Sequence, residues 1–453
     1  MKDQMKMSPL QLALLVIAIP VASNMVSLPM ALTDAAKQDA WIAFLMPIPY
    51  GIFIAYLFWK LCGWMPGKNM YEIVQQACGK WIGGLLNGML LLFLLLDIIS
   101  QIRLYSDFFS ASILLKTPPE YMVLATMLLL MYIATGTTEH LARANVVFIA
   151  LFILIYSPLP FLFLNEIDIT KLEPVMTRGI VPTIRGGILA TGSFGDIIVL
   201  GAFLHHVRKP RDIYFAVKAG VIFSCFMLTL WLLCVVSVIS PMLASRLAYI
   251  GWILVQQIHV TDFLDRVDLF LISLYVPVIL MKFGILYTAI LTGFASYTKK
   301  KKFDFINILA ALCIGMLTIL LFNNTEEVTM FTNFGIIPIT FGVQIVYIGC
   351  LLIGVALRRK LFQTKVMPSE QQNNLYGLLV WLSLIVCASA VVFGSVAGGS
   401  RGVYGIIAGI VYACFLLLVV YFSIKEFGEM MKRQARDHNS GRNESMGRGD
   451  SAI

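Results

Sequence analysis

Polar and charged residues that could do chemistry lie in the middle of long apolar stretches of this sequence. They are Ser23 and Asn24 in the first stretch, Asp97, Ser100 and Gln101 in the third, Ser193 and Asp196 in the sixth, and Lys282 in the eighth. In apolar surroundings such groups are costly, so they are expected to face a cavity or to pair with one another. Carboxylates, amides and one ammonium at a common depth therefore predict a buried binding site or a buried ion-pair network.

Helix breakers flank two of these groups. Pro20 and Pro29 enclose Ser23 and Asn24, and a Gly-Ser-Phe-Gly run over 192–195 precedes Asp196. A proline in a helix interior costs about 3 kcal/mol. We predict that the helix is unwound between Pro20 and Pro29, and again over 192–196. The freed backbone groups could bind a carboxylate and an ammonium, which suits a zwitterionic amino acid.

The predicted pocket combines side chains from four stretches. Its residues are Ser23, Asn24, Met25 and Ser27 from the first, Gln101 from the third, Gly192, Ser193, Phe194 and Asp196 from the sixth, and Lys282 from the eighth.

Structural roles for the same residues stay open at this point. Pro20 alone could be an ordinary kink, and Ser23 and Asn24 could join helices through hydrogen bonds. The ion-pair candidates are Asp97, Arg103, Asp196 and Lys282. Asp97 and Arg103 could form a structural pair. Lys282 must be paired or neutral, because an isolated buried ammonium is too costly, and Asp97 and Asp196 are its candidate partners.

The composition shows which solvent surrounds these stretches. The chain has 453 residues, of which 59% are apolar and 13% are charged, against roughly 45–50% and 25% in soluble domains. This excludes a soluble enzyme, a disordered chain and a nucleic-acid binder. About 20 apolar residues span a membrane, and twelve stretches qualify. They are Pro9–Leu32, Ala40–Cys62, Trp81–Leu115, Pro119–Thr135, Ala144–Leu164, Gly179–His206, Tyr214–Ile239, Val267–Tyr297, Phe305–Phe322, Met330–Leu357, Gly377–Val396 and Gly402–Ser423.

The distribution of positive charge predicts the orientation. If the N-terminus is inside, the inner segments hold 24 of the 34 Lys and Arg residues and the outer segments hold 8. By the positive-inside rule both termini are then cytoplasmic. The net charge of +9 thus reflects topology and not a nucleic-acid partner. In the outer segment after the seventh span, an amphipathic stretch over Leu247–Ile258 could lie on the outer mouth.

The spacing of the two interrupted spans predicts the architecture. The first and sixth are five apart, which is typical of an inverted five-plus-five repeat with discontinuous helices at a central site. We predict an all-α polytopic membrane protein of twelve spans: a ten-helix permease-like domain over 1–360, an additional helix pair over 361–424, and a cytoplasmic, disordered tail over 425–453.

Enzyme signatures are not found in the sequence. No GxxxxGK[ST], GxSxG or HExxH motif occurs, and the eight cysteines form no CxxC pair or cluster with histidine. We therefore expect no catalytic residue, no cofactor and no metal site.

Five short motifs resemble, in the right order, those of the spore germination permease family, the GerAB-type B subunits of germinant receptors. They are Leu28-Pro29-Met30-Ala31-Leu32 with Lys37–Trp41, Met65–Asn69 with Gly79–Gly83, Leu172-Glu173-Pro174-Val175 with Gly179–Pro182, Phe194-Gly195-Asp196, and Asp265-Arg266-Val267-Asp268.

This resemblance implies a fold of the amino acid–polyamine–organocation superfamily. It also implies partnership with a germinant-receptor A subunit and a lipoprotein C subunit in the inner membrane of a spore, and recognition of a small germinant such as an amino acid. Three features depart from the family pattern. Ser23-Asn24 replaces a pair of small glycines, Asp196 replaces a glutamate, and Gly377–Ser423 adds a helix pair.

Three functions share these features. The first is a germinant-sensing receptor subunit, which the resemblance favours. The second is an amino-acid secondary transporter coupled to protons or cations. The third is an ion-channel component. All three predict the same helices and the same polar residues at the midplane.

Overall fold

The computed structural model describes residues 7–207, 209–257, 267–297, 303–358, 375–399 and 402–449. These residues are almost entirely helical. The elements are α1 (Pro9–Asn24), α2 (Leu28–Ala36), η1 (Lys37–Leu45), α3 (Pro47–Trp64), α4 (Met70–Cys78), α5 (Lys80–Ser112), α6 (Pro119–Thr135), α7 (Thr138–Tyr156), α8 (Leu159–Leu162), η2 (Ile169–Leu172), α9 (Ile180–Ser193), η3 (Phe194–His206), α10 (Pro210–Ile239), α11 (Pro241–Ala244), α12 (Ile250–Gln256), α13 (Val267–Tyr297), α14 (Phe303–Leu320), α15 (Thr325–Met330), η4 (Phe331–Gly335), α16 (Ile336–Leu357), α18 (Leu375–Ala397) and α19 (Gly402–Gly449).

The apolar stretches predicted as spans form helices. Within the described residues, nine helical segments are long and apolar enough to cross a membrane, and α1, α6 and the stretch Phe305–Leu320 are shorter apolar helices. Many large apolar side chains remain exposed on the outer surface of the bundle, as expected where lipid is the solvent. The fold class predicted from the sequence, an all-α polytopic membrane protein, is confirmed.

Capping motifs in the sequence determine where α1 and α4 begin. At the start of α1, Ser8 and Gln11 form a reciprocal capping box that encloses Pro9 in the first turn. At the start of α4, Asn69 and Glu72 do the same. Each capping box satisfies backbone N–H groups that a helix leaves without an internal partner. The ends of these helices are therefore fixed by neighbouring residues in the sequence.

The first predicted span is interrupted, as the prolines indicated. Helix α1 ends at Asn24 and α2 begins at Leu28, so the break comprises Met25, Val26 and Ser27. The break is shorter than predicted, because Pro20 is accommodated inside α1, whereas Pro29 lies in the first turn of the new helix α2. A proline in the first turn of a helix costs nothing, since its missing N–H has no partner there.

The prediction that the sixth span is unwound over 192–196 is wrong, because this segment stays helical and changes only its helical geometry. The α-helix α9 ends at Ser193, and the chain continues directly as the 3₁₀ helix η3 from Phe194. The segment over 192–196 is therefore wound in two different ways. A 3₁₀ helix has three residues per turn instead of 3.6, so the side chains after Phe194 point in directions that a continuous α-helix would not give.

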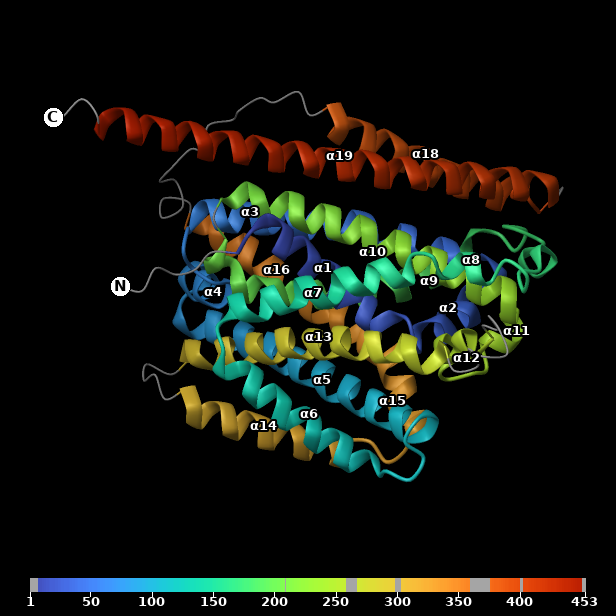
Figure 1. The fold of residues 1–453 in the computed structure, drawn as a ribbon, viewed down its shortest axis with the longest axis horizontal. Helices are drawn as coiled ribbons and strands as arrows, with labels where there is room; N and C mark the ends of the chain where they lie inside the picture. Colours follow the sequence, from blue (N-terminus) through green and yellow to red (C-terminus); the bar gives the residue numbers. More distant parts are fainter. Residues whose placement is uncertain are drawn as a thin grey trace.

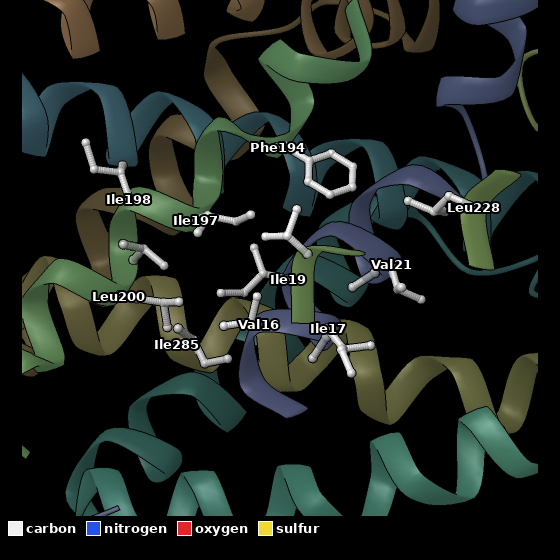
Figure 2. Close-up of a cluster of buried hydrophobic side chains, with 14 of the residues drawn as sticks. Val16, Ile17, Ile19, Val21, Phe194, Ile197, Ile198, Leu200, Leu228 and Ile285 are labelled. Carbon is white, nitrogen blue, oxygen red and sulfur yellow. The ribbon is translucent and has the colours of Figure 1, made fainter. Parts of the chain in front are cut away.

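The two interrupted spans pack against each other in the core. Figure 2 shows apolar side chains of α1 and η3 meeting those of α10 and α13; Val16, Ile19, Phe194, Leu200 and Ile285 are all buried there. Helix α1 also packs on α7 and α10, and α13 on α5 and α7. The discontinuities thus lie inside the bundle, where protein groups and not lipid surround the irregular backbone.

The last two helices form an antiparallel pair along one edge of the bundle, and α6 with α14 forms the opposite edge (Figure 1). Helix α19 packs on α10, where the Lys218 ammonium lies 2.7 Å from the Glu426 carboxylate, both side chains being buried. The tail over 425–453 was predicted to be disordered; its described residues, up to Gly449, continue α19 as helix from Gly402. Asp265 and Arg266 of the fifth motif lie outside the described residues.

Candidate functional site

The Lys282 ammonium lies at the centre of the buried polar groups. Its side chain is fully buried in α13, and Nζ donates to Asp196 Oδ2 of η3 at 2.6 Å and to Gln101 Oε1 of α5 at 2.6 Å. A further hydrogen bond runs from Nζ to the Ser23 hydroxyl of α1. The four spans that the sequence singled out therefore meet at one ammonium group.

Gln101 links two carboxylates around this ammonium. Its Nε2 donates to Asp97 Oδ1 at 2.6 Å and to Asp196 Oδ2 at 3.3 Å. The Ser23 hydroxyl contacts Asp196 Oδ2 at 3.5 Å and Ile19 O at 3.0 Å. We call these five residues, Ser23, Asp97, Gln101, Asp196 and Lys282, the Lys282 cluster.

The charges of the cluster are unequal. Two carboxylates face one ammonium, and Asp97 Oδ2 has no hydrogen-bond partner among the residues that the structure describes. Removing charges from water costs several kcal/mol per ion, which close partners and hydrogen bonds must offset. Lys282 and Asp196 offset each other directly. Asp97 Oδ2 could still accept a hydrogen bond from a further donor.

The break in the first span presents carbonyl groups that aromatic side chains bind. Ala22 O accepts from the hydroxyls of Tyr105 and Tyr275, the second at 2.6 Å. Met25 O accepts from Trp231 Nε1 at 2.9 Å. These bonds satisfy the backbone where the helix stops. The break is thus a fixed part of the fold and not a frayed end.

Helix α12, in the segment after α10, covers the break. Gly251 N donates to Val26 O at 3.2 Å, and a Cβ on Gly251 would lie 2.0 Å from Met25 O. Only glycine allows this close approach. The amphipathic stretch predicted for the outer mouth therefore packs directly on the interrupted helix over its described residues.

An apolar cavity lies between the break and α12. It measures about 20 Å³, room for about one water-sized group. Its lining residues are Met25, Val26, Phe108, Tyr156, Trp231, Gly251, Trp252, Val255, Ile272 and Tyr275. Five of the ten are aromatic, and none is charged. A larger molecule could enter only if α12 or these rings moved.

The structure places some predicted site residues at the site. Ser23, Gln101, Asp196 and Lys282 lie in the cluster, and Met25 lines the cavity. Asn24 is buried at the end of α1, and its Nδ2 has no hydrogen-bond partner among the described residues.

The other predicted site residues contact different partners. Ser27 Oγ donates to Asn333 Oδ1 of η4 at 3.2 Å, and Ser193 Oγ donates to Ala190 O of its own helix at 2.8 Å. A Cβ on Gly192 would lie 2.5 Å from the Ile337 side chain, so this glycine permits close helix packing. The Phe194 ring packs against Phe44 at a centroid distance of 6.2 Å.

Arg103 pairs with Asp107 and not with Asp97, which the sequence had left open as its partner. Arg103 Nε lies 3.1 Å from Asp107 Oδ1, one helical turn along α5. Asp97 instead accepts from Gln101. The spacing explains the choice, because residues four apart share a helix face, whereas residues six apart do not.

Several residues of the site were not found from the sequence. Tyr105, Trp231 and Tyr275 hold the carbonyls of the break, and Gln344 Nε2 of α16 donates to Gly195 O at 2.9 Å. Tyr50 OH in turn donates to Gln344 Oε1 at 2.6 Å. Gln344, a lone polar residue in the middle of an apolar stretch, could have been recognised from the sequence as a candidate site residue. The aromatic residues gave none, because tyrosine and tryptophan also fill ordinary cores.

Most of this chain matches one known protein family. The family described as "Spore germination protein" matches residues 6–328, well over half of the chain. The chain belongs to the spore germination protein family. Like other spore germination proteins it is a multi-pass membrane protein, of the spore inner membrane or the cell membrane.

Relatives in Bacillus subtilis (strain 168) share this assignment. The putative spore germination protein YfkT is 27% identical over 58% of this chain and 72% of its own length. Spore germination protein YndE is 23% identical over 65% of this chain and 82% of its own length. Spore germination protein KB is 22% identical over 72% of this chain and 87% of its own length.

Solved transporter structures share the fold of this spore germination protein. The nucleobase-cation-symport-1 family transporter MHP1, closed with bromovinylhydantoin bound, aligns with a TM-score of 0.53 at 13% identity, over 93% of this chain and 94% of its own. A substrate-bound, outward-open Na⁺-coupled sialic acid symporter aligns with a TM-score of 0.52 at 11% identity, over 91% and 89%. These likenesses establish a transporter-like fold.

Proposed function

We propose that this protein is the integral-membrane subunit of a spore germinant receptor that recognises a small germinant, an amino acid, at the break in its first span. In this proposal it works with a germinant-receptor A subunit and a lipoprotein C subunit, and its ten-helix region belongs to the amino acid–polyamine–organocation superfamily. The observation that carries the proposal is the burial of an interrupted helix beside the Lys282 cluster, in a chain of the spore germination protein family.

The free polar atoms of the site suit a zwitterion. Asn24 Nδ2 is a buried donor and Asp97 Oδ2 a buried acceptor, and neither has a hydrogen-bond partner among the described residues. A ligand carboxylate would accept from the amide, and a ligand ammonium would donate to the carboxylate. The aromatic cavity beside Met25 would take an apolar side chain. Such sites combine apolar walls with few polar groups.

Recognition would act by shifting a conformational equilibrium. A ligand changes an equilibrium only through its different affinity for the two states. The cavity of about 20 Å³ is too small for an amino acid, so the bound state needs movement of α12 or of the rings beneath it. We propose that this movement rearranges the pair of Lys282 and Asp196, and that the partner subunits respond to the new arrangement.

The experiment that tests the proposal is equilibrium binding to the purified full-length protein. The twenty amino acids, with sugars and nucleosides as further probes, would be titrated against tryptophan fluorescence, because Trp231 and Trp252 line the cavity. We expect saturable binding of at least one small molecule. If none of these molecules binds, the proposal is wrong.

An amino-acid secondary transporter is the second candidate, because both solved structures named above are transporters. Uptake of the bound solute into liposomes that contain this protein alone would favour it over a receptor subunit. Conductance without solute uptake in planar bilayers would instead favour the third reading, an ion-channel component.

A further inference from the structure

A hollow lined by basic residues lies away from the Lys282 cluster, at the end of the bundle where α4 and the N-terminus are found (Figure 1). It measures about 750 Å³ and is lined by Met65, Pro66, Lys68, Gln75, Gln76, Gly79, Lys80 and Arg358. These residues come from the segment after α3, from α4, from the start of α5 and from the end of α16. Three of the eight are cationic, and none is acidic.

Protein contacts fix the position of the Arg358 guanidinium, which lies at the end of α16 and lines the hollow. Arg358 Nη1 donates to Gln76 O at 2.8 Å. A Cβ on Gly79 would lie 3.3 Å from Arg358 Nη2, so the guanidinium rests against the glycine backbone. One edge of the guanidinium is thus fixed by protein. Its remaining N–H groups and the two ammonium groups are donors for an anion.

The start of α5 adds a second positive element. Gly79 has φ +90° and, lacking a side chain, gives no side-chain cap, and the first turn of this 33-residue helix contains no acidic residue. The first intrahelical bond runs from Gly83 N to Gly79 O, so the preceding N–H groups have no acceptor within the helix. The positive end of the helix dipole therefore lies at the hollow together with three cationic side chains.

The surface beside the hollow is apolar and matches lipid. Trp81 is 92% exposed, Leu85 77% and Leu357 81%. Trp81 directly follows the basic Lys80, in the position where aromatic side chains gather at a membrane interface. Acyl chains along Leu85 and Leu357 would place a lipid phosphate at the level of the cations.

We propose that this hollow binds a phosphate-bearing anion, supplied as the headgroup of an anionic phospholipid. Lys68, Lys80 and Arg358 bind the phosphate, and the volume of the hollow accommodates the rest of a headgroup. Basic pockets between membrane helices on the cytoplasmic side are suited to such lipids, and this is the side on which the charge distribution places the hollow. The bound lipid would join α5, which carries Asp97 and Gln101, to α16, which carries Gln344.

The test measures the thermal unfolding of the full-length protein in phosphatidylcholine nanodiscs with and without phosphatidylglycerol, and its lipid adducts by native mass spectrometry. We expect phosphatidylglycerol to raise the unfolding temperature and to remain bound as an adduct. The triple variant Lys68→Gln, Lys80→Gln, Arg358→Gln should reduce phosphatidylglycerol affinity by about tenfold or more. Inorganic phosphate in phosphatidylcholine nanodiscs forms the second arm.

A matched control distinguishes a specific lipid site from general electrostatic attraction between the protein and an anionic lipid. Lys60→Gln, Lys425→Gln, Lys432→Gln removes the same charge but none of these residues lines the hollow, so it should leave the affinity unchanged. An equal loss in this control would overturn the proposal, as would equal stabilisation by both lipids. Stabilisation by inorganic phosphate without any effect of phosphatidylglycerol would overturn the lipid assignment. If the triple variant does not fold, Lys80→Gln alone, at an exposed position, should still weaken adduct formation.

Discussion

At the scale of single residues, Lys282 decides how the site is held together. Its ammonium has close partners on three other elements: Ser23, Gln101 and Asp196. The hydrogen bonds to these partners offset the cost of burying the ammonium. Each partner in turn relies on the ammonium for a hydrogen bond. Removing one member of a buried pair is therefore far more costly than replacing both.

Lys282→Ala should lower the free energy of unfolding by about 3–5 kcal/mol, because it leaves Asp196 buried without its cation. Function should fall strongly as well. Adding Asp196→Asn should restore part of the stability, since an amide needs no countercharge. Thermal unfolding in detergent measures both effects. Lys432→Ala, at an exposed position of α19, is the control and should change nothing. A stable single variant, or no recovery in the double variant, would contradict this role.

At the scale of the elements, the approach of α12 to the break depends on Gly251. A Cβ there would lie 2.0 Å from Met25 O, which no side-chain adjustment can relieve. Gly251→Ala should therefore push α12 from the break, lower stability by about 1–3 kcal/mol and weaken germinant binding. Gly342→Ala is the matched control, because nothing lies within 4 Å of a Cβ at Gly342 in α16. Equal behaviour of the two variants would show that the contact with α12 is unimportant.

The contact of α19 with α10 rests on the buried pair of Lys218 and Glu426 at 2.7 Å. Lys218→Met alone should destabilise the protein by about 3–5 kcal/mol, whereas Lys218→Met with Glu426→Met should be close to neutral. Glu429→Gln, which removes the exposed partner of Arg433 at 3.8 Å, should cost at most about 1 kcal/mol. Chemical unfolding of the four proteins tests this. A double variant as unstable as the single one would show that the pair is not the relevant contact.

The helices and the polar residues at the centre of the site could be predicted from the sequence. The directions in which the neighbouring side chains point could not. Ser23 reaches the cluster because α1 continues through Pro20 to Asn24, whereas Ser27 follows the break and turns to Asn333. Where a helix stops depends on tertiary partners such as Trp231, which binds Met25 O. Those partners are distant in sequence. Propensity and spacing therefore cannot place them.

At the scale of the whole molecule, the charge distribution predicts one orientation. In a variant without the eight natural cysteines, Glu166→Cys in the segment before α9 should react with a membrane-impermeant thiol reagent in intact cells. Lys432→Cys in α19 should react only after permeabilisation. The positive-inside rule is the physical reason, because Lys and Arg are retained on the cytoplasmic side. Labelling of Lys432→Cys in intact cells would reverse the predicted topology.

The proposed germinant site lies where the first span is broken. Asn24 and Asn145 offer a matched pair for testing it. Both are buried asparagines whose Nδ2 has no hydrogen-bond partner among the described residues, and Asn145 Oδ1 has none there either. Asn24 adjoins the break, whereas Asn145 lies in α7. Replacing either by leucine makes the same chemical change in apolar surroundings.

The decisive measurement is the affinity of the purified protein for its germinant in the wild type, Asn24→Leu and Asn145→Leu, with the amount of folded protein in the membrane measured for each. We expect Asn24→Leu to lower the affinity by at least about tenfold, or about 1.4 kcal/mol, and Asn145→Leu to bind like the wild type. Unchanged affinity in a folded Asn24→Leu variant would contradict the claim and place the germinant elsewhere.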